Sequence, residues 1–487
     1  MRGRYADVAA TVNAAGGGVS RVDRPAARGY HAGMATRNEV TIVGGGLAGC
    51  EAAWQCAEAG VPVLLREMRP LATNPIHKTG RLAELVCSNS FKSKELATAH
   101  GLLKAELRAL GSLIVRSADA AAVPAGAALA VDREAFSAAV DEAIKGHPLI
   151  RIERGEVLEL PDDDPAIVAA GPLCSPALAA AIAAFTGEGN LAFYDAISPI
   201  VENESIDWSV AFRASRYGKG EGSDYANCPM NRAEYDAFYD ALLAATQADL
   251  HDFDRKLLFE GCLPIEELAL RGRDTLRFGP MKPVGLRDPR TGHRPWAVVQ
   301  LRQDNLAASH WSIVGFQNRI KWGEQERIFR MIPGLERASF VKLGMIHRNT
   351  YINAPRVLAE TFQTRKRPGL FFAGQISGVE GYTESTASGL VAGLGAAALV
   401  AGGTPPLFPE ETALGALQRY VARAEGETFQ PTNIAFGLLP PLADPPRAKR
   451  ERKRALSERA LAALASFAAE RRLPHFGAAQ EPPRDVD

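Results

Sequence analysis

The sequence predicts an α/β fold in which a parallel sheet covered by helices is interrupted by an inserted α+β domain. Three observations lead to this prediction. A strand, a glycine loop, a helix and a second strand follow one another from residue 40, another strand with a glycine turn appears near residue 370, and the composition changes in between. A chain of 487 residues also has room for two or three domains of about 150 residues each.

The first element is a βαβ unit. Residues 40–43 are an apolar run typical of a short buried strand, and the sequence Gly-Gly-Gly-Leu-Ala-Gly follows at 44–49. A helix is predicted over 50–59 and the next strand over 61–65. This order of elements is that of a nucleotide-binding unit.

The glycine loop has the spacing G-x-G-x-x-G. Its first glycine permits a tight turn, its second lets a pyrophosphate approach the backbone, and its third lets the helix pack closely on the strand. The helix N-terminus then faces the phosphates. Glu67 ends the next strand, where a carboxylate can accept ribose hydroxyls. A glycine turn without a ligand is the alternative. The predicted contacts are Gly44, Gly45, Gly46, Leu47, Ala48, Gly49 and Glu67.

The late strand, at 369–374, favours FAD over NAD as the nucleotide. It ends in a glycine turn, and a helix of small residues is predicted over 385–400. Such a segment can lie against the ribityl chain, with its helix N-terminus near the flavin pyrimidine. Gly374 and Gln375 are the predicted contacts, although an acidic residue is usual where Gln375 stands; a plain strand–helix unit is the alternative. We therefore predict a glutathione-reductase-like FAD-binding Rossmann domain.

The remaining elements define the predicted domains. Residues 80–115 are expected to be mostly helical with a polar break at 87–90, and a strand is expected at 167–170. Residues 205–334 contain more aromatics, Arg and Pro and less Ala than their surroundings. The predicted parts are a disordered extension 1–37, a discontinuous FAD-binding domain 38–204 and 335–446, an insertion domain 205–334, a charged C-terminal helix 447–472 and a tail 473–487.

Composition excludes several classes of protein. Lys plus Arg and Asp plus Glu both number 56, so the net charge of zero argues against a strongly basic nucleic-acid coat protein. The cysteines show no C-x-x-C spacing, which disfavours a zinc knuckle, a thioredoxin-like pair and a flavin disulfide reductase. No metal site is expected, and six cysteines are too few for a disulfide scaffold. They are Cys50, Cys56, Cys87, Cys174, Cys228 and Cys262.

Targeting and membrane signals are also missing from the sequence pattern. Residues 1–33 have no apolar core of signal-peptide length. We expect a flexible extension, or a start codon assigned too far upstream, with an Arg-rich transit peptide as the alternative. The nearly uncharged run 387–403 contains several glycines, so a buried helix is favoured over a membrane span. We expect a cytoplasmic protein.

Seven segments together carry a resemblance to a known family. They are residues 43–49, 85–90, 101–106, 259–266, 277–286, 347–353 and 372–382. The chain, from about Val40 to about Leu464, resembles the bacterial folate- and FAD-dependent tRNA (uracil-5-)-methyltransferases, which make ribothymidine in the T-loop. A cousin family, related to glucose-inhibited division protein A, modifies the wobble uridine and shares the flavin loops. It is expected to carry a longer C-terminal helical domain, for which this chain has no room. A non-catalytic flavin-binding RNA chaperone is the alternative outside enzymes.

The resemblance implies the chemistry. It implies methylation of C5 of uracil 54 of tRNA, with 5,10-methylenetetrahydrofolate as carbon donor, NAD(P)H as reductant and reduced FAD as carrier. Uracil C5 becomes nucleophilic when a thiolate adds to C6. Cys87 and Cys262 are the candidate catalytic residues because both lie in matched polar loops. Cys262 is favoured as the nucleophile and Cys87 as the flavin-side partner, and the order stays open.

Basic segments are the candidate tRNA contacts. Residues 271–294 carry a charge of +5, residues 319–348 carry +4 and residues 447–459 carry +5. Phosphate contact is predicted for the first two segments. The third is expected to be a solvated face of a helix, and a solvated face is also the alternative for the first two. A packed polar loop is the alternative for the residues from 347 to 351. The predicted substrate-binding residues are Arg273, Arg277, Lys282, His347, Arg348 and Tyr351. The oligomeric state is not predicted.

Overall fold

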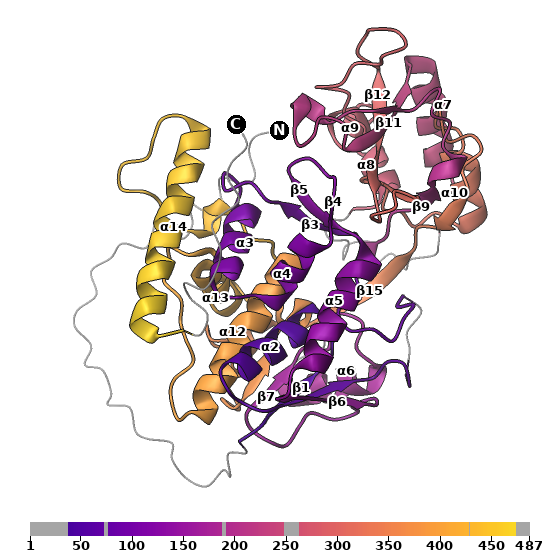
Figure 1. Ribbon diagram of the computed structural model, residues 1–487. Coiled ribbons are helices and arrows are strands. Elements are labelled where there is room, and N and C mark those ends of the chain that lie inside the picture. The colour runs from indigo at the N-terminus through magenta and orange to yellow at the C-terminus, as the bar shows by residue number, and fades with distance from the viewer. Residues whose placement is uncertain (1–37, 73–75, 188–190, 248–262, 428, 474–487) are drawn as a thin grey trace.

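The computed structural model describes residues 38–72, 76–187, 191–247, 263–427 and 429–473 (Figure 1). A five-stranded parallel sheet forms the centre of the larger part, and its strands are β1 (Val40–Val43), β2 (Val63–Glu67), β6 (Ile150–Arg154), β7 (Ala166–Val168) and β16 (Leu370–Phe372). Their spatial order is β6-β2-β1-β7-β16. In chain order this is third, second, first, fourth and fifth, which is the Rossmann arrangement, so the predicted fold class is confirmed.

Helices cover both faces of this sheet, which explains why all four residues of β1 are buried. One core layer gathers α2, α4 and α5 around Ile42, Leu65 and Phe136. The other gathers α3, α13 and α14 around Val43 and Phe372. The helices are α2 (Leu47–Glu58), α3 (Ala99–Ala109), α4 (Leu113–Ala120), α5 (Arg133–Gly146), α6 (Pro176–Thr186), α11 (Ala354–Val357), α12 (Tyr382–Val400), α13 (Ala413–Arg423) and α14 (Lys449–Arg471).

Helices α2 and α12 approach each other closely because glycines lie at the crossing. A Cβ placed on Gly389 would lie 2.3 Å from the Ala48 carbonyl oxygen, and one on Gly393 would lie 2.7 Å from that of Ala52. No larger residue fits at these two positions without moving the helices apart. The close crossing brings the turn after β16 next to the glycine loop after β1.

The helical prediction for residues 80–115 was wrong in its first half. Residues 90–93 form strand β3 (Ser90–Ser93) in a small sheet with β5 (Ala128–Val131) and β4 (Ala122–Val123). Helix α3 begins only at Ala99, where the Thr98 hydroxyl accepts a hydrogen bond from the Gly101 N–H at 3.1 Å. Pairing with β5 overrides the local pattern before that cap.

The inserted part is reached through two antiparallel strands, β8 (Leu191–Ala196) and β15 (Ile346–Tyr351). Beyond them lies a six-stranded sheet of order β10-β11-β12-β13-β9-β14, at the upper right of Figure 1. Its core is built around Trp311, Phe316 and Phe329. Its elements are β9 (Ile200–Glu202), β10 (Phe212–Arg213), β11 (Tyr225–Met230), α7 (Arg232–Leu243), α8 (Ile265–Leu270), α9 (Thr275–Phe278), β12 (Ala297–Gln303), β13 (His310–Ile313), α10 (Trp322–Phe329) and β14 (Phe340–Lys342).

The element boundaries differ from the sequence expectations by a few residues. Helix α2 begins at Leu47 rather than at residue 50, and α12 begins at Tyr382 rather than at 385. The adjacent strands β9 and β14, at one side of the inserted sheet, lie just outside the range 205–334. Among the described residues, no helix combines the length and the apolar character that crossing a membrane requires.

Candidate functional site

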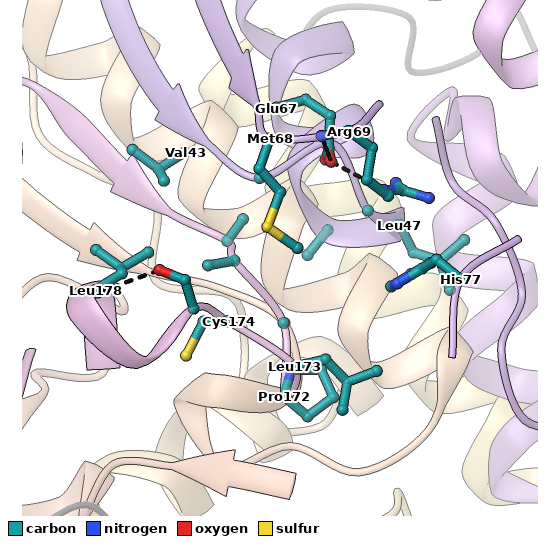
Figure 2. A pocket seen from close by; sticks show the side chains of 18 of the residues that line it. Val43, Leu47, Glu67, Met68, Arg69, His77, Pro172, Leu173, Cys174 and Leu178 are labelled. Atoms are coloured by element: carbon teal, nitrogen blue, oxygen red, sulfur yellow. Dashed lines mark hydrogen bonds and ion pairs between the residues drawn. The ribbon is translucent and has the colours of Figure 1, made fainter. Parts of the chain in front are cut away.

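A large pocket opens at the carboxyl ends of β1 and β7, where the strand order of the sheet reverses (Figure 2). This is the position at which open α/β sheets bind their ligands. The pocket encloses about 1000 Å³ of empty space, including the part open to solvent. Its lining comes from six stretches of the chain: Val43, Gly44, Gly46, Leu47, Ala48, Arg66, Glu67, Met68, Arg69, His77, Glu84, Val86, Gly155, Glu156, Val157, Ala169, Ala170, Gly171, Pro172, Leu173, Cys174, Ser175, Leu178, Gly374, Gln375, Tyr382 and Ser385.

The three glycines of the loop have separate roles. Gly44 has φ +104°, and a Cβ there would lie 2.4 Å from the Ala169 carbonyl oxygen. A Cβ on Gly49 would lie 1.8 Å from the Gly44 carbonyl oxygen. A Cβ on Gly46, in contrast, would meet no atom of the described residues within 4 Å. The protein itself therefore requires the first and third glycines, whereas the second leaves space at the N-terminus of α2, as a bound pyrophosphate requires.

Glu67 closes one side of the pocket and holds the glycine loop. Its carboxylate accepts hydrogen bonds from the Gly45 N–H at 2.7 Å and from the Arg69 N–H and Nε, both at 2.9 Å. Burial raises the pKa of Glu67, but the hydrogen bonds from Arg69 and Gly45 outweigh burial and leave this pKa below its usual value. Figure 2 shows the pair Glu67 and Arg69 across the pocket from Cys174 and Leu178. An ionised carboxylate at this position can also accept ribose hydroxyls.

Another part of the pocket wall comes from the turn after β16 and the first turn of α12. Gly374 and Gln375 line the pocket together with Tyr382 and Ser385. The Gln375 Nε2 donates to the Glu380 carboxylate at 2.6 Å. The N-terminal turn of α12 thus borders the space, where its N–H groups stabilise negative charge on a ligand.

Cys87 lies directly beside the pocket, one residue after the lining residue Val86. The Tyr382 hydroxyl accepts the N–H groups of both Cys87, at 3.0 Å, and Ser88, at 3.2 Å. The Cys87 Sγ lies 3.9 Å from the carbonyl oxygen of Ala196, at the end of β8. Tyr382 therefore connects the cysteine loop to the helix that borders the pocket.

Three cationic side chains surround the cysteine loop. Arg133 donates to the carbonyl oxygens of Leu85 and Cys87, at 2.9 and 3.2 Å. Arg302 donates to the Ser88 hydroxyl at 3.0 Å, and the Lys342 Nζ donates to the Val86 carbonyl oxygen at 3.2 Å. Burial and then the charge of Arg133 lower the pKa of Lys342 to about 8. Positive charge around a cysteine stabilises its thiolate, which is the reactive form.

The other cysteines differ in exposure. Cys50, Cys56 and Cys228 are buried, and burial raises the pKa of the last two to about 12. Cys174 is only partly buried and lines the pocket, and burial raises its pKa to about 11. Cys262, the second predicted catalytic residue, lies outside the described residues.

None of the predicted substrate-binding residues is among the lining residues of the pocket. Arg273 pairs with Asp236 at 2.9 Å and Asp240 at 2.5 Å. Arg277 pairs with Asp274 at 2.7 Å and lies over the Trp296 ring at 3.5 Å. These carboxylates therefore neutralise part of the positive charge of both arginines.

His347, Arg348 and Tyr351 lie on the connecting strand β15, and Lys282 lies in the inserted part. His347 and Arg348 pair in register with Asp195 and Tyr194 of β8. Tyr351 is 6% exposed and packs on Phe429 with ring centroids 6.2 Å apart, so its ring belongs to the core.

Sequence reasoning missed several residues of the site. Met68, Arg69, His77 and Cys174 line the pocket, and Arg133, Arg302, Lys342 and Tyr382 surround Cys87. The one available signal was position, because Arg69 follows Glu67 by two residues and Tyr382 ends a segment of the family resemblance. Among the described residues, no group of three or more His, Cys, Asp or Glu side chains is placed to hold a metal ion.

Lys104 provides a pH-dependent prediction. Its side chain is fully buried and donates to the Phe91 carbonyl oxygen at 2.8 Å, and burial, only partly offset by Glu384, lowers its pKa to about 7. Between about pH 7 and pH 10 the unfolded chain then binds a proton that the folded chain does not. The free energy of unfolding of the wild type should therefore rise with pH relative to Lys104→Met, by at most about 1.4 kcal/mol per pH unit. Urea titrations across this range measure the difference, and parallel curves would contradict a buried neutral lysine.

Comparisons with known proteins match this architecture. Residues 39–404 match the model of the family described as glucose inhibited division protein A. The chain is 58% identical to the methylenetetrahydrofolate--tRNA-(uracil-5-)-methyltransferase TrmFO of Heliobacterium modesticaldum, over 88% of this chain and 98% of that protein. It is 54% identical to the protein of the same name from Enterococcus faecalis, over 87% and 97%. The structure of Aquifex aeolicus GidA superposes with a TM-score of 0.65 at 15% identity, over 90% of this chain and 73% of that chain, which supports the fold alone.

Proposed function

This chain belongs to the glucose-inhibited division protein A family, in which its near relatives are folate-dependent tRNA (uracil-5-)-methyltransferases, and from that membership we propose that it methylates C5 of the T-loop uracil 54 of tRNA. The carbon donor is 5,10-methylenetetrahydrofolate, and NAD(P)H is the reductant. The observation that supports this most directly is that the Cys87 loop, with Arg133, Arg302 and Lys342 around it, lies beside the pocket. The partners are tRNA and folate, and we propose a cytoplasmic location in keeping with the cysteine usage.

FAD fits the residues of the pocket. When bound, it supplies a carrier for the one-carbon unit and for two electrons. Gly46 and the N-terminus of α2 would hold its pyrophosphate, and Glu67 its ribose. Gly374, Gln375 and the first turn of α12 would border the flavin ring.

Cys87 is proposed as a catalytic residue at the flavin side. The Tyr382 hydroxyl fixes its backbone, and Arg302, Lys342 and Arg133, which also pairs with Asp304 at 3.1 Å, place positive charge around its loop. Cys262 remains the proposed nucleophile toward uracil C6, which would make C5 nucleophilic and would leave by elimination once C5 loses its proton.

The RNA-binding role of the basic residues also remains a proposal. Lys282 is the member of the set whose ammonium lies beside an exposed aromatic ring, whereas Arg273 and Arg277 are paired with acids. His347, Arg348 and Tyr351 are proposed to act from the connecting strand. The two antiparallel connecting strands support the predicted division into an FAD-binding domain and an insertion.

The deciding experiment measures modified nucleosides. The purified yellow protein, incubated with unmodified tRNA transcript, methylenetetrahydrofolate and NADPH, should produce 5-methyluridine at position 54. Omitting the folate should abolish the product. A modified wobble uridine, or RNA binding without any product, would instead support the cousin family or a non-catalytic RNA chaperone.

A further inference from the structure

An exposed tyrosine in the inserted part is held in a conformation that its residue type disfavours. Tyr217 is 62% exposed, and its backbone has φ +62° and ψ +24°, in the left-handed region. A bulky residue there is strained, and glycine would adopt the same conformation freely. The ring lies close to Gly285, since a Cβ placed on that glycine would be 3.1 Å from ring atoms. The chain thus presents an aromatic face to solvent at a cost in backbone strain.

Contacts made by the neighbour of Tyr217 and by the cysteine loop meet on the same strand, β12. Arg216 donates to the Gln300 side chain and, at 2.5 Å, to the Lys282 carbonyl oxygen. Two residues further along β12, Arg302 donates to the Ser88 hydroxyl and to Asn89.

Gln300 and Arg302 lie on the same face of β12 because side chains alternate along a strand. The opposite face, with Val299 and Leu301, belongs to the core of the inserted sheet. One face of β12 therefore contacts both the neighbour of Tyr217, through Gln300, and the loop that carries Cys87, through Arg302.

Positive charge accompanies the exposed ring. The Lys282 ammonium lies 6.0 Å from the centroid of the Tyr217 ring, and the segment 271–294 that contains it carries a charge of +5. An aromatic face beside a cation is the combination that binds an unpaired base together with its phosphate. A duplex, whose bases are already stacked, offers no such face.

We propose that Tyr217 is a stacking platform for an unpaired nucleobase of the RNA substrate, with Lys282 contacting the adjacent phosphate, so that the substrate class is RNA with a splayed-out loop. This inference rests on the proposed function and adds to it a residue that selects loops over duplexes.

The test compares Tyr217→Gly, Tyr217→Phe and Lys282→Ala with the wild type. Affinity is measured for unmodified tRNA transcript and for a blunt RNA duplex of the same length, over a series of salt concentrations. Tyr217→Gly should weaken tRNA binding about 5- to 150-fold, and Tyr217→Phe should bind like the wild type. Lys282→Ala should reduce the salt slope by about 0.7 to 0.9. Duplex binding should not change in either Tyr217 variant.

Stability and a matched variant separate this role from a structural one. Tyr217→Gly relieves the left-handed strain, so its thermal midpoint should not fall and its flavin content should stay that of the wild type. Trp208, 37% exposed beside Arg213 and outside both basic segments, serves as the control, and Trp208→Leu should leave tRNA affinity unchanged. Unchanged affinity in Tyr217→Gly, or an equal loss in Tyr217→Phe, would overturn the platform. A wild type that binds and methylates no tRNA would instead overturn the proposed function.

Discussion

Gly46→Val is expected to yield a folded, colourless protein. A side chain at this position meets no atom of the described residues within 4 Å, so the fold can accept it. It projects, however, into the space where the pyrophosphate must approach the backbone. Absorbance at 450 nm per mole of purified protein should fall to near zero, while far-ultraviolet circular dichroism stays that of the wild-type apoprotein.

Gly49→Ala is the matched control, because it adds one methyl group to the same loop. Its Cβ would lie 1.8 Å from the Gly44 carbonyl oxygen, so the chain must shift. It should cost about 1 to 3 kcal/mol of unfolding free energy, the range for overpacking a well-packed core. A Gly46→Val protein that remains fully yellow would show that the pyrophosphate lies elsewhere.

Cys87→Ala is expected to lower methylation by about 100- to 10,000-fold, the range that a positioned acid–base or nucleophilic group contributes. The Cys87 and Ser88 N–H groups that bind Tyr382 are on the backbone, so the loop keeps its anchor in this variant. The protein should therefore retain FAD. Single-turnover methylation of unmodified tRNA measures the loss.

Cys228→Ala provides the control, since Cys228 is buried in the core of the inserted sheet and burial raises its pKa to about 12. It should methylate at the wild-type rate despite a small loss of stability.

A tRNA carrying 5-fluorouracil at the target should still crosslink to Cys87→Ala if Cys262 attacks uracil. Crosslinking that disappears in Cys87→Ala reverses the two roles, and full activity in Cys87→Ala removes this residue from the chemistry.

The nucleotide pocket could be predicted from the sequence because its main parts are local. Gly44, Gly46 and Gly49 lie within six consecutive residues, and the strand and helix that they join follow from short-range patterns. Gly374 could be placed because its strand also ends in a glycine turn. Each of these features needs only a few neighbouring residues to be recognised.

The surroundings of Cys87 could not be predicted, for a physical reason. Arg133, Arg302 and Lys342 come from three elements more than 40 residues from it in sequence, and only the tertiary fold brings them to one loop. The same reasoning explains the overestimate of free basic charge, because Arg273 meets Asp236 and Asp240 only after α7 has packed.

The two connecting strands show how the chain could be divided by protein engineering. Ala196, at the end of β8, pairs with Ile346, at the start of β15, so a short turn could join them in place of everything between. The shortened protein would keep Gly46, Glu67 and the turn after β16, and thus the dinucleotide pocket. It would lose Arg302 and Lys342 and keep only Arg133 beside Cys87. The dinucleotide pocket and the full set of cationic side chains around Cys87 are therefore separable, and the second is complete only when the inserted part is present.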